Sequence, residues 1–290
     1  MIFAIKRFET HDGDGIRTTV FFKGCPMRCL WCHNPESFKS GREISYNGEL
    51  CRWCGGCAEI CEANGFENGK HLFLREKCNF CGECLSACPA RAFEIYGDTR
   101  TPSEIAEEVL LDEMFFKGSG GGVTFSGGEP LLQVDFCVEL AKILKERDIN
   151  IAVDTCGFVP REAIDKALPY TDTFLYDVKA VDPEVHRICT GKTNELILEN
   201  LKYIDSCGKN IEIRIPYVPG YNSGEIEGIS ELLSGLKNVK AIRVLPYHKY
   251  AEAKYLSLEL FDLSPRNLPT KAEIERAKGI IRKICGDKVL

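Results

Sequence analysis

Residues 18–34 read TTVFFKGCPMRCLWCHN, an apolar run followed directly by three cysteines at the spacing CxxxCxxC. The apolar run predicts a strand over roughly residues 17–23 that is buried on both faces, as in a parallel sheet. Three thiolates can hold three irons of a [4Fe–4S] cube and leave the fourth iron open for reaction, which favours such a cluster at Cys25, Cys29 and Cys32. A zinc site with His33 as its fourth ligand is the alternative.

Sixteen cysteines in 290 residues are the outstanding feature of the composition. Eleven of them stand in tight clusters of the CxxC type, and residues 1–7 lack the apolar core of a signal peptide. We therefore expect metal ligation in a reducing cytoplasm rather than disulfides. The other five are expected to be small buried residues: Cys137, Cys156, Cys189, Cys207 and Cys285.

Length and charge narrow the class of protein further. A chain of this length can form one large core, or one core plus a small module. The hydrophobic fraction is 44%, the charged fraction 28% and the net charge −6. No apolar run approaches the ~20 residues of a membrane helix. We expect a globular protein that binds neither nucleic acid nor membrane.

A cysteine-rich segment, residues 36–97, interrupts the rest of the pattern. It carries the spacing CxxCxxCxxxC twice, and the second copy ends in Cys88-Pro89 as in bacterial two-cluster ferredoxins. The two quartets are Cys51, Cys54, Cys57, Cys61 and Cys78, Cys81, Cys84, Cys88. Two structural zinc sites are the alternative. We predict a ferredoxin-like insertion with two [4Fe–4S] clusters, inside a larger domain made of residues 1–35 and 98–290.

The ligation within this insertion could be sequential or crossed. Three cysteines at two-residue spacing wrap one cube in a tight loop, and the three residues that follow carry the chain toward the neighbouring cube. We therefore predict crossed pairing, in which Cys88 completes the first site and Cys61 completes the second.

Beyond residue 98 short apolar strands alternate with helices. After the strand at 17–23, strands are predicted at 122–126, 151–155, 173–179, 211–216 and 239–246. Helical spacing is found in the run 105–115, which Thr101 or Ser103 can cap. The later helices are expected near 131–147, 160–168, 182–189, 194–206, 225–236 and 270–285. Right-handed crossovers would curl the six strands into an α/β fold, a partial (β/α)6 barrel of the TIM type.

Polar residues collect at the carboxyl ends of these strands, where parallel α/β folds place their active sites. A glycine turn, Gly127-Gly128-Glu129, follows one strand, and its acid could instead face the dipole of the next helix. The others are Asp154, Thr155, Asp177, Lys179, Arg214 and His248. Helix caps, ion pairs and, for His248, a bond to a backbone carbonyl are the alternatives. Recurrence on successive strand ends favours one shared polar ligand.

The CxxxCxxC loop at the end of a first strand resembles the radical S-adenosylmethionine (SAM) superfamily. The stretch Asp12–Arg17, the sequence Cys32-His33-Asn34 and the DTxG pattern at 154–157 resemble the glycyl-radical enzyme activating enzymes. The resemblance implies that the glycine turn meets the amino end of SAM. It implies that the DTxG residues and the DxK pattern at 177–179 line the SAM carboxylate and ribose, with their acids helping to hold a monovalent cation.

The same resemblance implies further residues and a partner. Arg214 and His248 match positions that contact SAM. The loop with Asp12, Gly13, Asp14, Gly15 and Arg17 matches the contact with the partner's glycyl-radical loop, and Asp14 stands where the family often has proline.

The implied activity is reductive cleavage of SAM. Reduced flavodoxin or ferredoxin supplies an electron through the insertion, and a 5′-deoxyadenosyl radical removes hydrogen from a glycine of the partner. The protein is expected to be a monomer. A radical SAM enzyme for another peptide or small molecule, and a simple electron carrier, are the competing functions.

Overall fold

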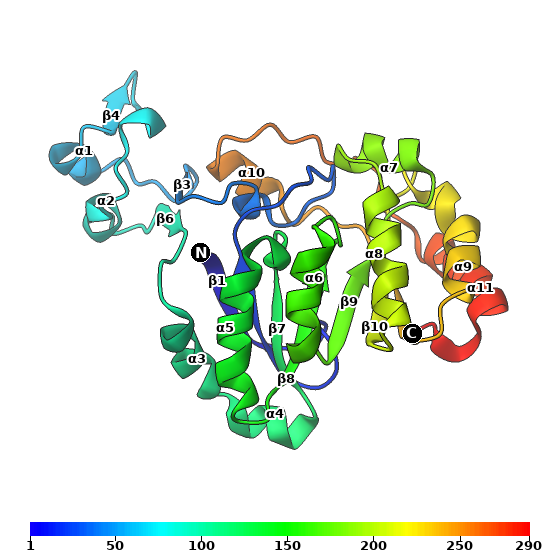
Figure 1. Ribbon diagram of the computed structural model, residues 1–290. Coiled ribbons are helices and arrows are strands. Elements are labelled where there is room, and N and C mark those ends of the chain that lie inside the picture. Colours follow the sequence, from blue (N-terminus) through cyan, green and yellow to red (C-terminus); the bar gives the residue numbers. More distant parts are fainter.

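A seven-stranded, mostly parallel sheet forms the body of the protein (Figure 1). The computed structural model describes all 290 residues. The strands lie side by side in chain order, and only β1 runs antiparallel to its neighbour. They are β1 (Ile2–Glu9), β2 (Arg17–Phe22), β7 (Gly122–Gly127), β8 (Asn150–Thr155), β9 (Thr173–Asp177), β10 (Asn210–Tyr217) and β11 (Val239–Pro246). The six predicted strands and the α/β class are confirmed.

Helices pack along this sheet, and a core cluster of 44 buried residues joins the two layers. They are α3 (Pro102–Leu110), α5 (Val134–Lys145), α6 (Arg161–Ala167), α8 (Glu195–Ser206), α9 (Ile226–Ser234) and α11 (Lys271–Cys285). Thr101 rather than Ser103 caps α3, in a capping box with Glu104. The predicted helices are confirmed within a few residues at their ends, except the first.

The apolar run 105–115 does not form one helix. It is divided between α3 and α4 (Glu113–Ser119). Between them Asp112 is buried and accepts hydrogen bonds from Thr18 Oγ1 and from Arg7 Nε, both at 2.7 Å. A buried carboxylate needs such partners, and they come from the sheet edge rather than from the helix. Helical spacing alone could not predict this break.

The first strand of the sheet was missed by the sequence analysis. Residues 1–17 were expected to lead into the first strand, yet Ile2–Glu9 forms β1, paired antiparallel with β2. The loop of residues 10–16 returns the chain to β2. The segment that resembles a partner-binding loop is therefore the connection of a two-stranded edge.

The cysteine-rich segment folds against itself beside the β1 edge and projects from the body (Figure 1). Its strands β3 (Glu43–Tyr46) and β6 (Phe93–Tyr96) pair, as do β4 (Asn64–Glu67) and β5 (Lys70–Phe73). Its helices α1 (Gly56–Ile60) and α2 (Glu83–Ala87) contact each other. A small separate core of seven buried residues lies among these elements.

The two cysteine quartets share their backbone conformation as well as their spacing. Trp53 and Phe80 occupy equivalent positions, and their φ angles are 57° and 60°. Left-handed conformations are uncommon for such bulky residues. Gly55 and Gly82, each the N-cap of its helix, both have φ 84°. The internal repeat seen in the sequence is thus also a structural repeat.

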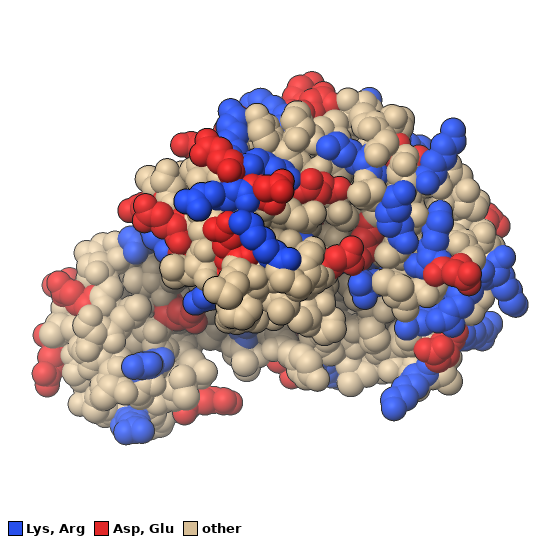
Figure 2. Space-filling view, turned by 90° about the horizontal axis from the view of Figure 1, so that it is seen from below, with Lys and Arg blue, Asp and Glu red and all other residues tan.

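The surface carries no large area of one charge on the face shown in Figure 2, where acidic and basic side chains alternate. The lobe at the left of that view, formed by the cysteine-rich segment, carries fewer charges than the body. None of the helices combines the length and the apolar character that crossing a membrane requires.

The five isolated cysteines do not all follow the prediction. Cys137, Cys156 and Cys189 are buried, as expected for small apolar residues. Cys285 is only half-buried, and Cys207 is exposed. The expectation is wrong for Cys207, because this residue follows α8 at its carboxyl end and faces solvent.

Candidate active site

A cavity of about 430 Å³ opens at the carboxyl ends of the parallel strands. The three cysteines of the CxxxCxxC loop line it together with residues from β7, β8, β9, β10 and the segment after β11. The predicted residues on its wall are Cys25, Cys29, Cys32, Gly127, Gly128, Asp154, Thr155, Asp177, Lys179, Arg214 and His248. Side chains that are more than two hundred residues apart in sequence thus share one site.

Backbone contacts hold the cysteine loop in place. The amides of Arg28 and Leu30 donate to the carbonyls of Thr190 and Cys189, at 2.8 and 2.9 Å, near the end of α7 (Pro183–Thr190). The Arg28 guanidinium donates to the Cys25 carbonyl at 2.8 Å. The loop therefore presents its thiols from a fixed backbone.

The three thiols share an environment that disfavours their charged form without a cation. Burial raises the pKa of Cys25 to about 12, and the neighbouring Cys29 adds to the rise. Burial also raises the pKa values of Cys29 and Cys32. Thiolates that gather in a buried site are stabilised by metal, and metal binding releases their protons. The donor set fits a cationic iron–sulfur group.

His33 is engaged elsewhere and does not complete a ligand set with these thiols. Its Nε2 lies 3.0 Å from the carbonyl oxygen of His248, and the two imidazole rings stack with centroids 3.9 Å apart. Tyr250 packs against the ring of His248, with ring centroids 4.3 Å apart. The Nδ1 atom of His248 is buried and has no hydrogen-bond partner. His248 is therefore not the carbonyl-bonded core histidine of the alternative, and its free nitrogen suits a polar ligand in the cavity.

The two glycines of the turn after β7 are required by packing. A Cβ at Gly127, where φ is +115°, would lie 2.4 Å from the backbone nitrogen of Phe22. A Cβ at Gly128 would lie 2.2 Å from the carbonyl oxygen of Gly24. The sequence suggested that glycine lets a ligand approach. The structure adds that glycine lets this turn touch the base of the cysteine loop.

Glu129 is fully buried and does not line the cavity. Its carboxylate accepts hydrogen bonds from Thr155 Oγ1 at 2.8 Å, from the Cys156 amide at 2.8 Å and from the Leu131 amide at 3.1 Å. Burial raises the pKa of Glu129, while these donors oppose the rise. The carboxylate of Glu129 faces the start of the following 3₁₀ turn, close to the alternative in which it faces a helix dipole. It also joins the glycine turn to the end of β8.

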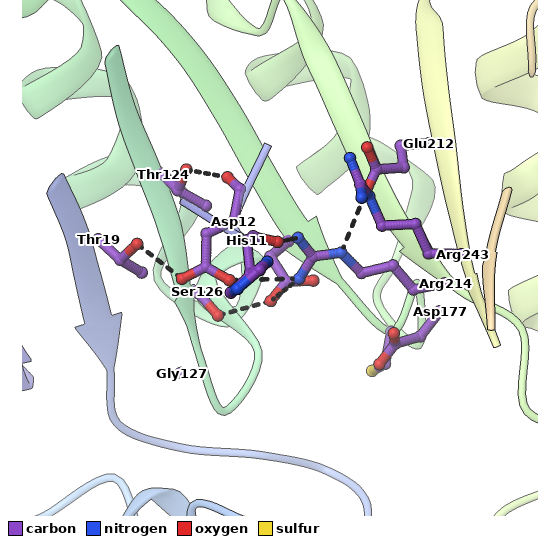
Figure 3. A network of polar contacts seen from close by, with 12 residues as sticks. His11, Asp12, Thr19, Thr124, Ser126, Gly127, Asp177, Glu212, Arg214 and Arg243 are labelled. Atoms are coloured by element: carbon purple, nitrogen blue, oxygen red, sulfur yellow. Dashed lines mark hydrogen bonds and ion pairs between the residues drawn. The ribbon is translucent and has the colours of Figure 1, made fainter. Parts of the chain in front are cut away.

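Charged residues line the floor of the cavity, and Figure 3 shows the polar contacts around Arg214. Arg214 Nη1 lies 3.5 Å from a carboxylate oxygen of Asp12 and 3.5 Å from one of Asp154. Asp154 also accepts a hydrogen bond from Ser126 Oγ at 2.6 Å. Burial raises the pKa of Asp154 to about 7; Arg214 opposes the rise, and Asp177 and Asp12 add to it. Carboxylates outnumber cationic side chains around Arg214, which suits a small cation or a cationic ligand.

Asp177 and Lys179 form an ion pair at 2.5 Å on the neighbouring strand end. Burial alone would lower the pKa of Lys179, but Asp177 and the nearby thiols Cys29 and Cys156 raise it above its ordinary value. The ammonium group is therefore held charged between the acid and the cysteine loop.

The residues expected to meet a partner are mostly internal. Arg17 is 2% exposed and donates to Thr124 Oγ1 and to the Val123 carbonyl, both at 2.7 Å. Asp12 accepts from Thr19 Oγ1 at 2.8 Å, and its other carboxylate oxygen lies 3.5 Å from Arg214 Nη1 (Figure 3). Gly13 is buried, Gly15 is half-buried and Asp14 is exposed.

The cysteines of residues 36–97 group across the two quartets. Cys51, Cys54, Cys57 and Cys88 line one small pocket. Burial raises the pKa of Cys84 to about 11, and Cys61, Cys78 and Cys81 add to the rise, so these four are neighbours. Nowhere in the structure are three or more His, Cys, Asp or Glu side chains arranged to hold a single metal ion.

Sequence reasoning missed a helix that braces the cysteine loop from the far end of the chain. Lys254 in α10 (Glu252–Ser257) donates to the His33 carbonyl at 2.8 Å, and Tyr255 Oη donates to the Cys32 carbonyl at 3.1 Å. The buried residues Ala251, Tyr255 and Leu258 have helical spacing, which could have predicted this element.

Comparison with known proteins fits this site. Residues 75–233 match the sequence model of the radical SAM superfamily. The choline trimethylamine-lyase activating enzyme of Oleidesulfovibrio alaskensis is 39% identical, over 98% of this chain and 95% of that one. The trans-4-hydroxy-L-proline dehydratase activating enzyme of Clostridioides difficile is 39% identical over 96% and 94%. The chain belongs to the glycyl-radical enzyme activating enzymes, a family of the radical SAM superfamily.

Solved structures agree with the fold. A domain of a pyruvate-formate lyase-activating enzyme from Bacteroides vulgatus is 29% identical, with a TM-score of 0.50 over 59% of this chain and 98% of that one. Streptococcus suis SuiB bound to its precursor peptide SuiA has a TM-score of 0.56 at 12% identity, over 91% of this chain and 44% of that one, and supports the fold alone. Membership in the family implies a [4Fe–4S] cluster, SAM and a glycyl-radical enzyme as partner.

Proposed function

We propose that the cavity at the strand ends binds a [4Fe–4S] cluster through Cys25, Cys29 and Cys32, and SAM beside it. One observation carries this assignment: three thiols, a glycine turn and four charged side chains line a single cavity of about 430 Å³. When bound, the cluster and SAM supply an electron and a 5′-deoxyadenosyl radical, which takes hydrogen from a glycine of the partner. The protein's residues bind, orient and exclude water.

The amino-acid end of SAM would lie against the backbone of Gly127 and Gly128 and near Arg214. Supporting this, the Arg214 guanidinium lines the cavity and lies 3.5 Å from a carboxylate oxygen of Asp154, so a SAM carboxylate would share it with Asp154. Thr155 is held by Glu129 at the same wall. The unpartnered Nδ1 of His248 would receive a polar group of the ligand.

We further propose a monovalent cation between the acids Asp154 and Asp177. Burial raises the pKa of Asp154 to about 7, and the nearby charge of Asp177 adds to the rise. A cation there would let both remain charged. Lys179 would then be free to face the ribose while keeping its pair with Asp177.

For residues 36–97 we propose a ferredoxin-like insertion with two further [4Fe–4S] clusters in crossed ligation. The pocket shared by Cys51, Cys54, Cys57 and Cys88 supports this pairing. So does the proximity of Cys84 to Cys61. The rest of the chain, 1–35 and 98–290, would then be a partial (β/α)6 barrel whose open edge receives the partner. A reduced flavodoxin or ferredoxin would load the insertion with electrons, and the enzyme would act as a monomer.

The partner's glycine loop would approach the cavity from its mouth and end near Asp12. Only Asp14 of the 12–17 loop is exposed, so it is the residue of this loop that could contact a partner directly. Arg17 would act indirectly, by holding the loop through Thr124 and Val123.

The test is to replace Cys29 by Ala in reconstituted protein and to measure 5′-deoxyadenosine under dithionite. We expect no SAM cleavage, because a ligand of the reactive cluster is lost. The exposed Cys207→Ala variant is the matched control and should cleave SAM at the original rate. Substantial 5′-deoxyadenosine from the Cys29 variant would overturn the assignment.

A further inference from the structure

Arg75 connects the insertion to a part of the chain that follows the last strand. It leaves the 3₁₀ turn Arg75–Lys77 and donates to the carbonyl of Ser257 at 2.7 Å. Its Nε lies 2.9 Å from a carboxylate oxygen of Glu259, and it also donates to the carbonyl of Ile44 in β3. One guanidinium thus bridges segments 182 residues apart in sequence.

The carbonyl contacts matter more than the ion pair. The side chain of Glu259 is 55% exposed, so solvent screens its charge and the ion pair contributes little. The Arg75 side chain is only 26% exposed, and hydrogen bonds from a charged donor are stronger than those between neutral groups. The bridge therefore depends mainly on the two backbone carbonyls.

The other end of the bridge reaches the radical site. Ser257 ends α10, three residues after Lys254 and two after Tyr255, which bond to the carbonyls of His33 and Cys32. Lys254 also pairs with Glu36 at 2.5 Å. The helix packs between β3 of the insertion and the turn Pro35–Ser37 that follows the cysteine loop. One short helix thus contacts both regions.

The backbone of Glu259 is strained, as expected where the segment after α10 is held against Arg75. Its φ is +55°, which a residue with a Cβ adopts at a cost. The strain lies just beyond α10, at the residue that faces Arg75. Glycine would adopt this conformation without strain, yet it would remove the carboxylate.

We propose that Arg75 is a positioning residue that clamps the insertion to α10 and thereby holds it at a fixed distance from the Cys25–Cys32 loop. The root of the insertion is fixed separately, since buried Lys23 pairs with Glu43 at 2.9 Å. Arg75 constrains the part beyond that root. The proposal rests on the proposed route of one electron from a protein donor, through the insertion, to the C–S bond of SAM that breaks.

The first test is hydrogen exchange of the reconstituted protein, wild type against Arg75→Ala. Amides of residues 43–46 and 252–260 should exchange about tenfold faster, the factor that corresponds to about 1.4 kcal/mol of lost local stability. A smaller rise should reach residues 30–36. Lys77→Ala, an exposed cation of the same turn, is the matched control and should leave the exchange unchanged. Unchanged exchange at 252–260 in Arg75→Ala would overturn the clamp.

The second test compares 5′-deoxyadenosine formation driven by reduced flavodoxin with that driven by dithionite. In Arg75→Ala the flavodoxin-driven rate should fall several-fold more than the dithionite-driven rate. Glu259→Gly should show a weaker fall without loss of thermal stability, since it removes both the charge and the strain. Equal rate losses with both donors would refute the positioning role.

A failure of the electron route can be told apart from a failure of the clamp. If Cys54→Ala leaves the flavodoxin-driven rate unchanged, the insertion does not carry the electron and the proposed function is wrong on that point. The exchange experiment still decides whether Arg75 joins the insertion to α10, because it does not depend on electron transfer.

Discussion

Replacing Glu129 by Ala should weaken the packing of the cavity wall that Thr155 and Cys156 form. The carboxylate is buried and receives the hydroxyl of Thr155 and the amides of Cys156 and Leu131. Alanine leaves these three donors without an acceptor, and water cannot reach them unless the turn opens. The glycine turn and the carboxyl end of β8 would then no longer be joined by the Glu129 carboxylate.

The magnitude follows from the number of orphaned donors. Each buried donor left unsatisfied costs about 1–3 kcal/mol. Part of this loss is returned because the variant no longer buries a charge. A net loss of about 3 kcal/mol is expected, which a domain with an ordinary stability of about 5–15 kcal/mol survives. Glu129→Gln keeps one acceptor oxygen and should lose less.

Two measurements check this prediction. Denaturant unfolding under anaerobic conditions gives the free energy of unfolding, and steady-state assays give KM for SAM. We expect KM to rise about tenfold, which corresponds to about 1.4 kcal/mol at the wall that Thr155 and Cys156 form. Glu139→Ala, an exposed acid on α5, is the control. If Glu129→Ala matches this control in both stability and KM, the hydrogen bonds of Glu129 do not support the cavity wall.

Three further outcomes are expected. Cys54→Ala or Cys81→Ala should slow turnover with reduced flavodoxin, whereas dithionite should restore much of the SAM cleavage; equal losses would mean that the insertion serves only stability. In crossed ligation Cys61→Ala should remove the cluster of Cys78, Cys81 and Cys84 and spare the other, as iron counts and electron paramagnetic resonance can tell; loss of the Cys51 cluster instead would favour sequential ligation. Burial lowers the pKa of His186 below 6.5, so the unfolded state binds its proton first and the free energy of unfolding should fall as pH drops below that value. His186→Gln should flatten this dependence, and an unaltered slope would contradict it.

Residues 36–97 and the Cys25–Cys32 loop are connected more closely than their separation in the sequence suggests. The segment 36–97 has its own small core, yet Lys23 and Arg75 tie it to the body at two places. The second tie passes through α10, which also holds the cysteine loop. The cysteine-rich segment and the Cys25–Cys32 loop thus both contact one helix.

The sequence alone was enough for the parts of this protein that local pattern determines. Continuous apolar runs predicted the six parallel strands, because strands buried on both faces leave no polar alternation. Thiol spacing singled out the cysteine loop, which lines the cavity, and the repeat within residues 36–97, which recurs in the backbone conformation. DTxG and the glycine turn pointed to the right strand ends, because parallel strands bring those ends to one edge.

Only the tertiary structure decided what these residues do for one another. Glu129 belongs behind the wall rather than on it, and Arg17 is an internal clamp, because burial depends on neighbours that are distant in sequence. The break at Asp112 and the edge strand β1 have the same origin. Glycine is required at position 157 of DTxG because a Cβ there would lie 1.7 Å from the hydroxyl of Tyr176, a contact between the turn after β8 and strand β9. Local pattern places each element, but contacts between elements determine which side chains face the cavity, and those contacts exist only in the folded chain.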